Sequence, residues 1–127
     1  MNISDSLIRY NYVKSNYLRG GGIYSENSRI KINKTHLDHN FADEGGAICS
    51  INSSVDIYTS LIYNNYANWY DGAIVTDSNL FINNTRIYNN RAGYKGGAIH
   101  TTYYSIENCY VDINYTSILI IRPNMGV

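Results

Sequence analysis

Apolar and polar residues alternate along much of this chain in short segments that recur. The triplets Ile30-Lys31-Ile32, Val55-Asp56-Ile57 and Leu80-Phe81-Ile82 each place two apolar side chains on one face of an extended segment. The segments Thr35-His36-Leu37 and Thr85-Arg86-Ile87 repeat this alternation a few residues later. A period of two residues is that of a β-strand and not that of an amphipathic helix. The pattern therefore predicts an all-β chain.

A glycine-containing tetrapeptide recurs at nearly constant spacing. It reads, in chain order, Gly20-Gly21-Gly22-Ile23, Gly45-Gly46-Ala47-Ile48, Asp71-Gly72-Ala73-Ile74 and Gly96-Gly97-Ala98-Ile99. Its isoleucines stand 25, 26 and 25 positions apart. Equal units of this length are typical of a solenoid, in which each unit packs on its neighbours. A third strand of each unit is expected to begin at the small residue and the isoleucine.

Further columns of like residues keep the same register. The asparagine column is Asn16, Asn40, Asn65, Asn90 and Asn114, and three positions before it stand Val13, Leu37, Ile62, Ile87 and Val111. A second aliphatic column is Ile8, Ile32, Ile57, Ile82 and Ile106. The columns predict one domain of five coils, at about 6–29, 30–54, 55–79, 80–103 and 104–127. Three short strands per coil predict a single-stranded parallel β-helix, because a propeller blade needs four strands and about 40 residues.

Two of these columns are expected to form the turns. In a parallel β-helix identical residues stack from coil to coil, so the asparagine amides are expected to form a hydrogen-bonded ladder at a bend. The second glycine of the tetrapeptide, at Gly21, Gly46, Gly72 and Gly97, does not vary within the chain. A positive φ or a close backbone approach explains that constancy. The preceding position accepts Asp71, which is consistent with a left-handed conformation there.

Composition excludes some functions and leaves others open. The chain of 127 residues has a formal net charge of zero and no cluster of Lys and Arg, which argues against a nucleic-acid partner. No apolar run approaches the length of a transmembrane helix, and the N-terminus lacks the pattern of a signal peptide. Because the repeat begins in mid-pattern, we expect a piece of a longer array or a truncated reading frame. Cys49 and Cys109 stand in different columns and are expected to be free thiols.

The paired motifs resemble a known repeat family. The best matches are Leu37-Asp38-His39-Asn40 leading into Gly45-Gly46-Ala47-Ile48, and Ile87-Tyr88-Asn89-Asn90 leading into Gly96-Gly97-Ala98-Ile99. They are similar to the FxxN and GGA[ILV] motifs of polymorphic outer-membrane-protein repeats, found in chlamydial autotransporters and in adhesin-like surface proteins of methanogenic archaea. The phenylalanine of FxxN is replaced by an aliphatic residue in every unit. The resemblance implies a right-handed β-helix of the pectin-lyase-like superfamily, displayed at the cell surface or secreted, with adhesion as its role.

The sequence offers little support for catalysis. Some right-handed β-helices cleave polysaccharides with carboxylates on neighbouring coils, but one outward column here is Lys14, Asp38, Tyr63, Tyr88 and Asp112, with its two acids three coils apart. That is roughly 14 Å at the strand spacing, too far for a glycosidase pair. The segment His36-Leu37-Asp38-His39 does not converge on one metal ion, and Lys31 beside Asp56 predicts a surface ion pair. We expect no enzyme activity, no cofactor and no metal.

Aromatic side chains are the best candidates for a binding surface. Tyr63 and Tyr88 are expected to stack outward in one column, and Tyr17, Phe41, Tyr66 and Tyr115 in another just past the asparagines. Such rows suit a glycan or protein partner, and they also suit a purely structural role. The leading hypothesis is a non-enzymatic segment of a surface adhesin; the alternative is a polysaccharide-binding or polysaccharide-degrading β-helix whose active coils lie elsewhere. Five Asn-x-Ser/Thr sequons would fit a glycosylated surface protein. Open strand edges at the coil ends predict self-association.

Overall fold

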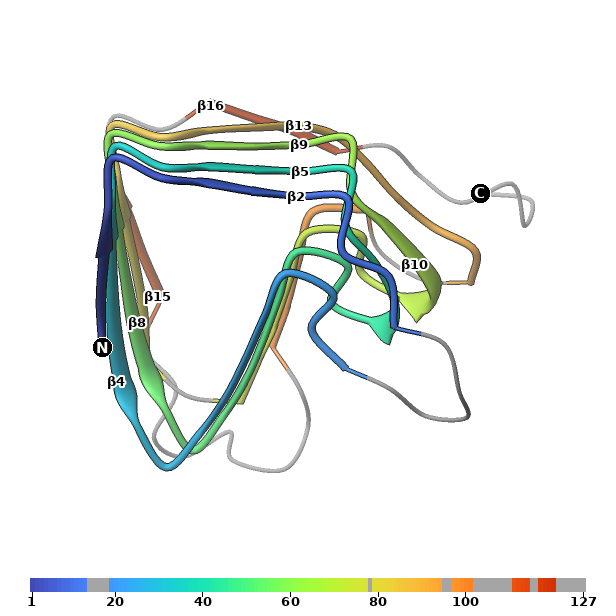
Figure 1. Ribbon diagram of the computed structural model, residues 1–127, viewed down its shortest axis with the longest axis horizontal. Coiled ribbons are helices and arrows are strands. Elements are labelled where there is room, and N and C mark those ends of the chain that lie inside the picture. The colour runs from blue at the N-terminus through green and yellow to red at the C-terminus, as the bar shows by residue number, and fades with distance from the viewer. Residues whose placement is uncertain (14–18, 78, 95–96, 102–110, 115–116, 121–127) are drawn as a thin grey trace.

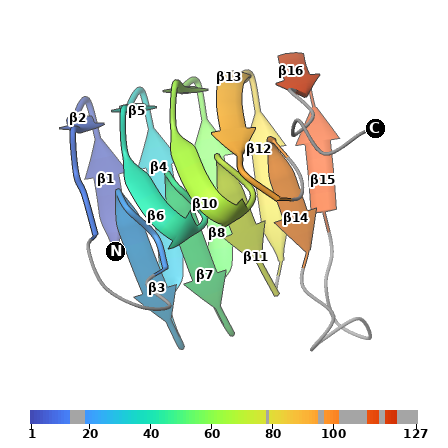
Figure 2. The same ribbon diagram turned by 90° about the vertical axis from the view of Figure 1, so that its right-hand side faces the viewer.

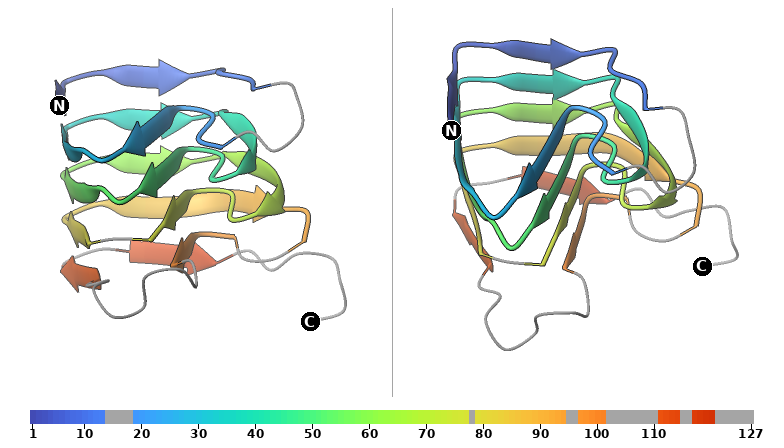
Figure 3. Two further views of the ribbon diagram at one scale, coloured as in Figure 1. Left: turned by 90° about the horizontal axis from the view of Figure 1, so that it is seen from below. Right: turned by 60° about the horizontal axis from the view of Figure 1, so that its bottom comes forward.

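The protein is a parallel β-solenoid of about four turns, as a computed structural model shows. The structure describes residues 1–13, 19–77, 79–94, 97–101, 111–114 and 117–120. Figure 1 looks along the stack of coils, and Figures 2 and 3 show the same strands lying side by side from one coil to the next. The described residues contain no helix, so none that could span a membrane. The predicted all-β parallel solenoid is confirmed, with slightly fewer turns than the five coils expected.

Three parallel sheets run along the stack. The first sheet contains, in order, β1 (Asn2–Ser4), β4 (Arg29–Asn33), β8 (Ser54–Tyr58), β12 (Leu80–Asn83) and β15 (Val111–Asn114). The second contains β2 (Leu7–Arg9), β5 (His36–Asp38), β9 (Leu61–Tyr63), β13 (Arg86–Ala92), β10 (Tyr66–Tyr70) and β6 (Phe41–Glu44), and β16 (Ser117–Ile120) also pairs with β13. The third contains β14 (Ile99–Thr101), β11 (Ile74–Thr76), β7 (Ile48–Ile51) and β3 (Ile23–Glu26).

The core lies inside the coils and is built from the alternating apolar positions. Ile32 pairs in register with Ile57, and Ile57 pairs with Ile82, so identical side chains stack along the axis. Large inward residues of the inner coils are no more than 1% exposed, as shown by Ile30, Leu37, Ile48, Ile62, Ile74 and Ile87. Burial of a side chain of this size stabilises a fold by about 2 kcal/mol. Each inner coil therefore contributes a layer of apolar contacts that only its neighbours can complete.

Each inner coil has one more strand than the sequence pattern predicts. The residues that follow the asparagine form β6 and β10, which pair in register from Phe41 to Tyr66 and from Ala42 to Ala67. In the next coil a single strand, β13, continues through the bend from Arg86 to Ala92. The small residues Ala42, Ala67 and Ala92 point inward here and are buried. Their single methyl groups gave too weak a hydrophobic signal to predict a strand.

The two glycine columns serve different purposes. The first column has positive φ, with values of 66° at Gly20, 62° at Gly45 and 48° at Asp71. The second column does not have positive φ; it lies where backbones of neighbouring coils approach closely. A Cβ added at Gly46 would lie 2.5 Å from the carbonyl oxygen of Gly72, closer than real Cβ contacts allow. Close approach is therefore the reason that the second glycine does not vary.

The first and last coils follow a different register from the one predicted. Ile8 pairs with Leu37 in the second sheet and Ile3 takes the place beside Ile32, so the first unit is longer than the others by the segment before its tetrapeptide. At the other end, Val111 pairs with Leu80 and Ile113 with Ile82 in the first sheet. Ile106, which was assigned to the second aliphatic column, lies outside the described residues. Both errors arose because aliphatic residues were assigned to the wrong inward column. Any inward column accepts an aliphatic side chain, so residue type alone did not reveal the mistake.

Candidate functional site

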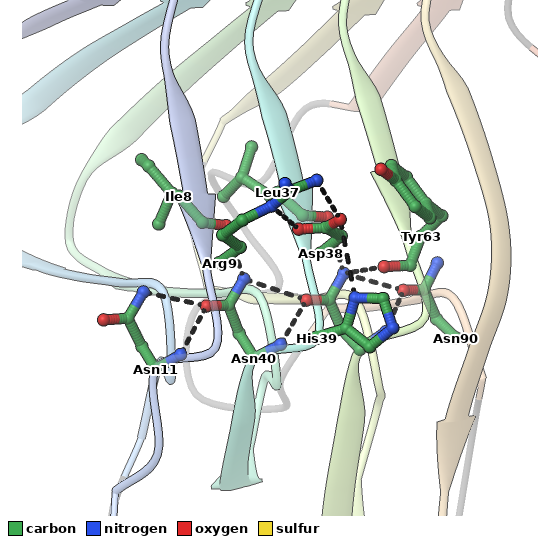
Figure 4. A network of polar contacts seen from close by, with 10 residues as sticks. Ile8, Arg9, Asn11, Leu37, Asp38, His39, Asn40, Tyr63 and Asn90 are labelled. Atoms are coloured by element: carbon green, nitrogen blue, oxygen red, sulfur yellow. Dashed lines mark hydrogen bonds and ion pairs between the residues drawn. The ribbon is translucent and has the colours of Figure 1, made fainter.

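An asparagine ladder forms the bend between the second sheet and the strands β6 and β10, and Figure 4 shows it from close by. The side-chain amide of Asn40 donates to Oδ1 of Asn65 at 3.0 Å, and that of Asn65 donates to Oδ1 of Asn90 at 2.9 Å. Each Oδ1 also accepts the backbone N–H of the ladder asparagine one coil earlier, so Asn65 Oδ1 accepts from Asn40 and Asn90 Oδ1 from Asn65, both at 3.0 Å. These asparagines are no more than 1% exposed. The ladder thus satisfies polar groups that a sharp bend would leave unpaired in the core.

The ladder has two features that the sequence pattern did not predict. The positive φ of the bend belongs to the residue before each ladder asparagine, at His39, Asn64 and Asn89, each with φ 55°. In the first coil the ladder position is taken by Asn11, whose amide donates to Oδ1 of Asn40 at 2.9 Å.

Two of the asparagines assigned to this column need correction. Asn16 lies outside the described residues, and Asn11 holds the place predicted for it. Asn114 pairs in register with Asn83 in the first sheet and so does not belong to the ladder. Of the second-glycine column, Gly21, Gly46, Gly72 and Gly97 all lie in the turn before the third sheet.

Aromatic side chains cluster on the outside of this bend, a surface we call the aromatic corner: Tyr10, Tyr12, His39, Phe41, Tyr63, Tyr66 and Tyr88. The rings of Tyr63 and Tyr88 stack with centroids 5.1 Å apart and an angle of 4° between planes. Phe41 stacks on Tyr66 at 5.3 Å, and Tyr12 stacks on Phe41 at 4.7 Å. The structure thus brings Tyr63 and Tyr88 into one row and Phe41 and Tyr66 into another. Tyr17 and Tyr115 lie outside the described residues.

Ring orientation limits what the aromatic corner can bind. Because the rings lie nearly parallel and one coil apart, the faces of Phe41 and Tyr63 are turned toward neighbouring rings. Their outward parts are ring edges, which carry partial positive charge, and the hydroxyl groups of the tyrosines. Tyr12, at the start of its row, is 61% exposed. The rows therefore present hydrogen-bonding edges more than flat platforms for sugar rings.

A buried carboxylate anchors the N-terminal end of the aromatic corner. Asp38 is 1% exposed and accepts two hydrogen bonds from Arg9, at 2.9 Å from Nε and 2.8 Å from Nη2. His39 Nδ1 lies 3.4 Å from Oδ2 of the same carboxylate (Figure 4). Burial opposes the charged form of Asp38, but the hydrogen bonds and charge of Arg9 outweigh it and hold its pKa below the usual value. This bidentate pair fixes the first two coils in register rather than leaving a free acid for chemistry.

The outward column that contains Asp38 differs from the predicted one. Its members are Arg9, Asp38, Tyr63 and Tyr88. Asp112 pairs with Phe81 in the first sheet, so the two acids belong to different sheets. Asp56 is 2% exposed and its ion pair is with Arg29, at 3.1 Å, where Lys31 was predicted to be the partner. Within the described residues no three of the His, Cys, Asp and Glu side chains are grouped to hold a metal ion.

Serine and threonine hydroxyls form further ladders that the sequence pattern did not predict. The Oγ atoms of Thr35, Ser60 and Thr85 each donate to the carbonyl two residues earlier, at 2.7 to 3.0 Å. The hydroxyls also link neighbouring coils. The backbone N–H of Thr35 donates to the hydroxyl oxygen of Ser60 at 3.1 Å, and the backbone N–H of Ser60 donates to that of Thr85 at 3.2 Å. Thr35 and Thr85 are the third residues of the sequons at Asn33 and Asn83. The repeated Asn-x-Thr pattern thus has a structural cause in these two coils, and the spacing of Ser and Thr could have revealed it.

The remaining buried nucleophile and acid lie away from the aromatic corner. Cys49 is a free, buried thiol whose pKa is raised to about 12 by burial, while Cys109 lies outside the described residues. Asp71 is fully buried, and its carboxylate oxygens accept no hydrogen bond from the described residues. His100 Nδ1 lies 3.4 Å from Oδ2 of Asp71. Burial raises the pKa of Asp71 to about 7, and the negative charge of Glu44 adds to the shift.

Asp71 is expected to make the stability of the fold depend on pH. Because the pKa of Asp71 is raised in the folded state, folding favours the protonated carboxyl group. The stability of the fold should therefore decrease as the pH rises from about 4 to about 7 and the buried carboxyl group loses its proton. Relative to Asp71→Asn, the wild type should lose up to about 4 kcal/mol of unfolding free energy across this window. Urea unfolding of both proteins at about pH 4 and about pH 8 measures the difference. If the difference in unfolding free energy between the two proteins is the same at both pH values, the raised pKa of Asp71 is contradicted. Replacing the titratable neighbours His100 and Glu44 is then the next experiment.

Comparison with known proteins gives one finding that bears on identity. Residues 80–102, which run from β12 through β13 into β14, match the family model of the Chlamydia polymorphic membrane protein (Chlamydia_PMP) repeat. Comparisons with curated proteins and with solved structures give no match. The match covers one coil, and the register of the sheets shows that the neighbouring coils repeat its architecture. The match and the parallel solenoid together support polymorphic membrane protein repeats as the building unit of this chain.

Proposed function

We propose that this chain is a non-enzymatic, surface-exposed solenoid segment of an adhesin-like protein, and that it binds its partner through the aromatic corner. The observation that carries the proposal is the aromatic corner, in which Tyr10, Tyr12 and Tyr66 are 69%, 61% and 38% exposed. Exposed aromatic side chains in a continuous patch mark interaction sites on soluble proteins. The Chlamydia polymorphic membrane protein repeat supports a place at the outer membrane or cell surface.

The chemistry of the aromatic corner favours binding over turnover. Its buried acid, Asp38, is held by Arg9, and its other outward groups are ring edges, hydroxyls and imidazoles. Such groups form hydrogen bonds and edge-on aromatic contacts, and a rigid solenoid holds them in place before the partner arrives. The solenoid would act as a stiff support that displays these side chains in rows.

A matched pair of tyrosines tests the proposal. Tyr66 in the aromatic corner and Tyr58 on the outside of the first sheet are both 38% exposed, so Tyr66→Ala and Tyr58→Ala remove similar surface. Fluorescently labelled protein is applied to fixed epithelial cells, and bound protein is measured over a range of concentrations. We expect binding by the wild type and by Tyr58→Ala, and at least about tenfold weaker binding by Tyr66→Ala, typical of a loss of about 1.4 kcal/mol.

Two outcomes would contradict the proposal. Equal binding by Tyr66→Ala and Tyr58→Ala would place the contact elsewhere on the solenoid. Release of reducing ends from polygalacturonate by the wild type, lost in Asp38→Asn, would replace adhesion with polysaccharide cleavage. Surface labelling of intact cells of the source organism with an antibody to the chain tests the proposed location, and labelling only after permeabilisation would contradict it.

A further inference from the structure

Two arginines on the strand β13 have no acidic partner among the described residues. Arg9, Arg19 and Arg29 each form an ion pair with a carboxylate, at 2.8 to 3.1 Å. Arg86 and Arg91 pair with none of the described carboxylates, although both side chains are exposed. Their guanidinium groups are therefore positive charges that the neighbouring coils do not neutralise.

The register of the strands places both arginines beside the aromatic corner. Arg91 pairs with Tyr66, which pairs with Phe41, so Arg91 continues that row by one coil. The guanidinium carbon of Arg86 lies 5.2 Å from the ring centroid of Tyr88, within the range of a cation–π contact. The aromatic corner thus has two positive charges on this coil, one on each side of the asparagine bend.

Acidic residues are few on this side of the solenoid. The strands β9, β10 and β13 contain none. The strands β2, β5 and β6 contain three, and each has a polar partner: Arg9 for Asp38, Asn68 for Asp43 and Arg19 for Glu44. The formal net charge of zero for the whole chain therefore includes a locally positive surface.

We propose that the partner of the aromatic corner is a protein segment rich in Asp and Glu, whose carboxylates pair with Arg86 and Arg91. This inference rests on the proposed function and names the chemistry of the partner. A guanidinium group binds a carboxylate through two parallel hydrogen bonds. The edges of aromatic rings carry partial positive charge and attract the same groups. The arginines and the ring edges thus favour one kind of ligand.

Ring orientation and strand pairing narrow the choice of partner. A sugar ring packs against the face of an aromatic ring, but the faces of Tyr63 and Tyr88 are turned toward each other, with 4° between their planes. The strand β9 is paired on both sides, with β5 and with β13, so a peptide cannot bind there by adding a strand. Recognition therefore depends on side chains, and charge sets its specificity.

Fluorescence anisotropy of a labelled peptide, titrated with the full chain, tests the proposal. The probe is a peptide in which Glu alternates with Ser, and a second probe has Gln in place of each Glu. We expect the wild type to bind the Glu peptide and not the Gln peptide, and to bind more weakly as salt screens the charges. The double variant Arg86→Gln/Arg91→Gln should bind the Glu peptide about tenfold more weakly, because it loses two charged contacts.

Lys31→Gln/Lys34→Gln is the matched control. It removes the same two positive charges from exposed residues in and just after β4, on the first sheet and its turn. We expect this variant to bind the Glu peptide like the wild type. Circular dichroism of both double variants checks that the fold is kept.

Three outcomes would overturn the proposal. Equal or absent binding of the two peptides would show that the surface does not select carboxylates. Equal weakening by the two double variants would reduce the effect to the net charge of the chain. Tighter binding of hyaluronan than of the Glu peptide, lost in Arg86→Gln/Arg91→Gln, would assign the surface to an acidic glycan instead of a protein.

The cell-binding assay separates this inference from the proposed function. Cell binding that is lost in Tyr66→Ala, but is unchanged in Arg86→Gln/Arg91→Gln and by excess Glu peptide, would overturn the acidic partner and leave adhesion standing. Equal cell binding by Tyr66→Ala and Tyr58→Ala would contradict adhesion through the aromatic corner. Arginine-dependent binding of the Glu peptide would still support an acidic ligand in that case.

Discussion

Gly72→Val is expected to destabilise the protein by about 3 kcal/mol or more, and Asp71→Gly is not. A Cβ at Gly72 would overlap the backbone N and O of Arg91, which belong to the strand β13 and cannot move without breaking its pairing. Asp71, by contrast, holds a φ of 48°, which glycine adopts without strain. Its replacement also removes a buried carboxylate whose oxygens accept no hydrogen bond from the part of the chain that the structure describes. We expect Asp71→Gly to raise the unfolding free energy by about 1 kcal/mol or more at neutral pH.

Thermal and urea unfolding of the two variants provide the measurement. The adjacent positions make each variant a control for the other, because both change the same turn and the same coil. Gly46→Ala is a further check, since an added Cβ there meets the carbonyl of Gly72 and should destabilise the next coil in the same way. Equal unfolding midpoints for Gly72→Val and Asp71→Gly would show that the close approach of the coils does not control stability.

Asn65→Ala is expected to lower the unfolding free energy by about 4 kcal/mol. The Asn65 amide donates to Leu37 O at 2.9 Å and to Oδ1 of Asn90 at 2.9 Å, and its Oδ1 accepts the backbone N–H of Asn40 at 3.0 Å. Alanine would remove these bonds and leave the backbone N–H of Asn40 buried without its acceptor, while the Asn40 amide would keep only its bond to the carbonyl oxygen of Ile8. The unpaired groups account for most of the loss, because a buried, unsatisfied polar group costs about 1–3 kcal/mol.

The neighbouring asparagine is the matched control. Asn64 is exposed and has a φ of 55°, so Asn64→Gly keeps the left-handed conformation without touching the ladder. Chemical unfolding of the two variants should show a large loss for Asn65→Ala and a change of less than about 1 kcal/mol for Asn64→Gly. Similar losses would mean that the bend depends on backbone conformation and not on the ladder.

The inner coils could be predicted from the sequence because several columns agree there. The Ile-x-Ile triplets, the ladder asparagine and the tetrapeptide each fix the same 25-residue register, so an error in one would conflict with the others. In the first coil an additional segment separates the ladder asparagine from the tetrapeptide, so Asn16 fits the 25-residue spacing better than Asn11, which nevertheless holds the ladder position. Spacing therefore favoured the wrong residue, because the ladder position depends on which residue's backbone pairs with the second coil.

The candidate site was predicted in part. The rows of Tyr63 with Tyr88 and of Phe41 with Tyr66 follow from their shared columns, because residues in one column stack one coil apart. The sequence could not show that the rings lie nearly parallel and use one another's faces. It also could not place Arg9 against Asp38, since that pair depends on the register of the first coil.

The sequence by itself determined the parallel solenoid, because a strand period of two and a repeat of about 25 residues leave few other ways to bury these side chains. It also determined which residues point inward in the inner coils. Tertiary structure decided the register of both end coils, the extra strand after each asparagine bend and the surfaces that the aromatic rings expose. Those features depend on backbone pairing between segments of unequal length, and local side-chain patterns do not record how two such segments align.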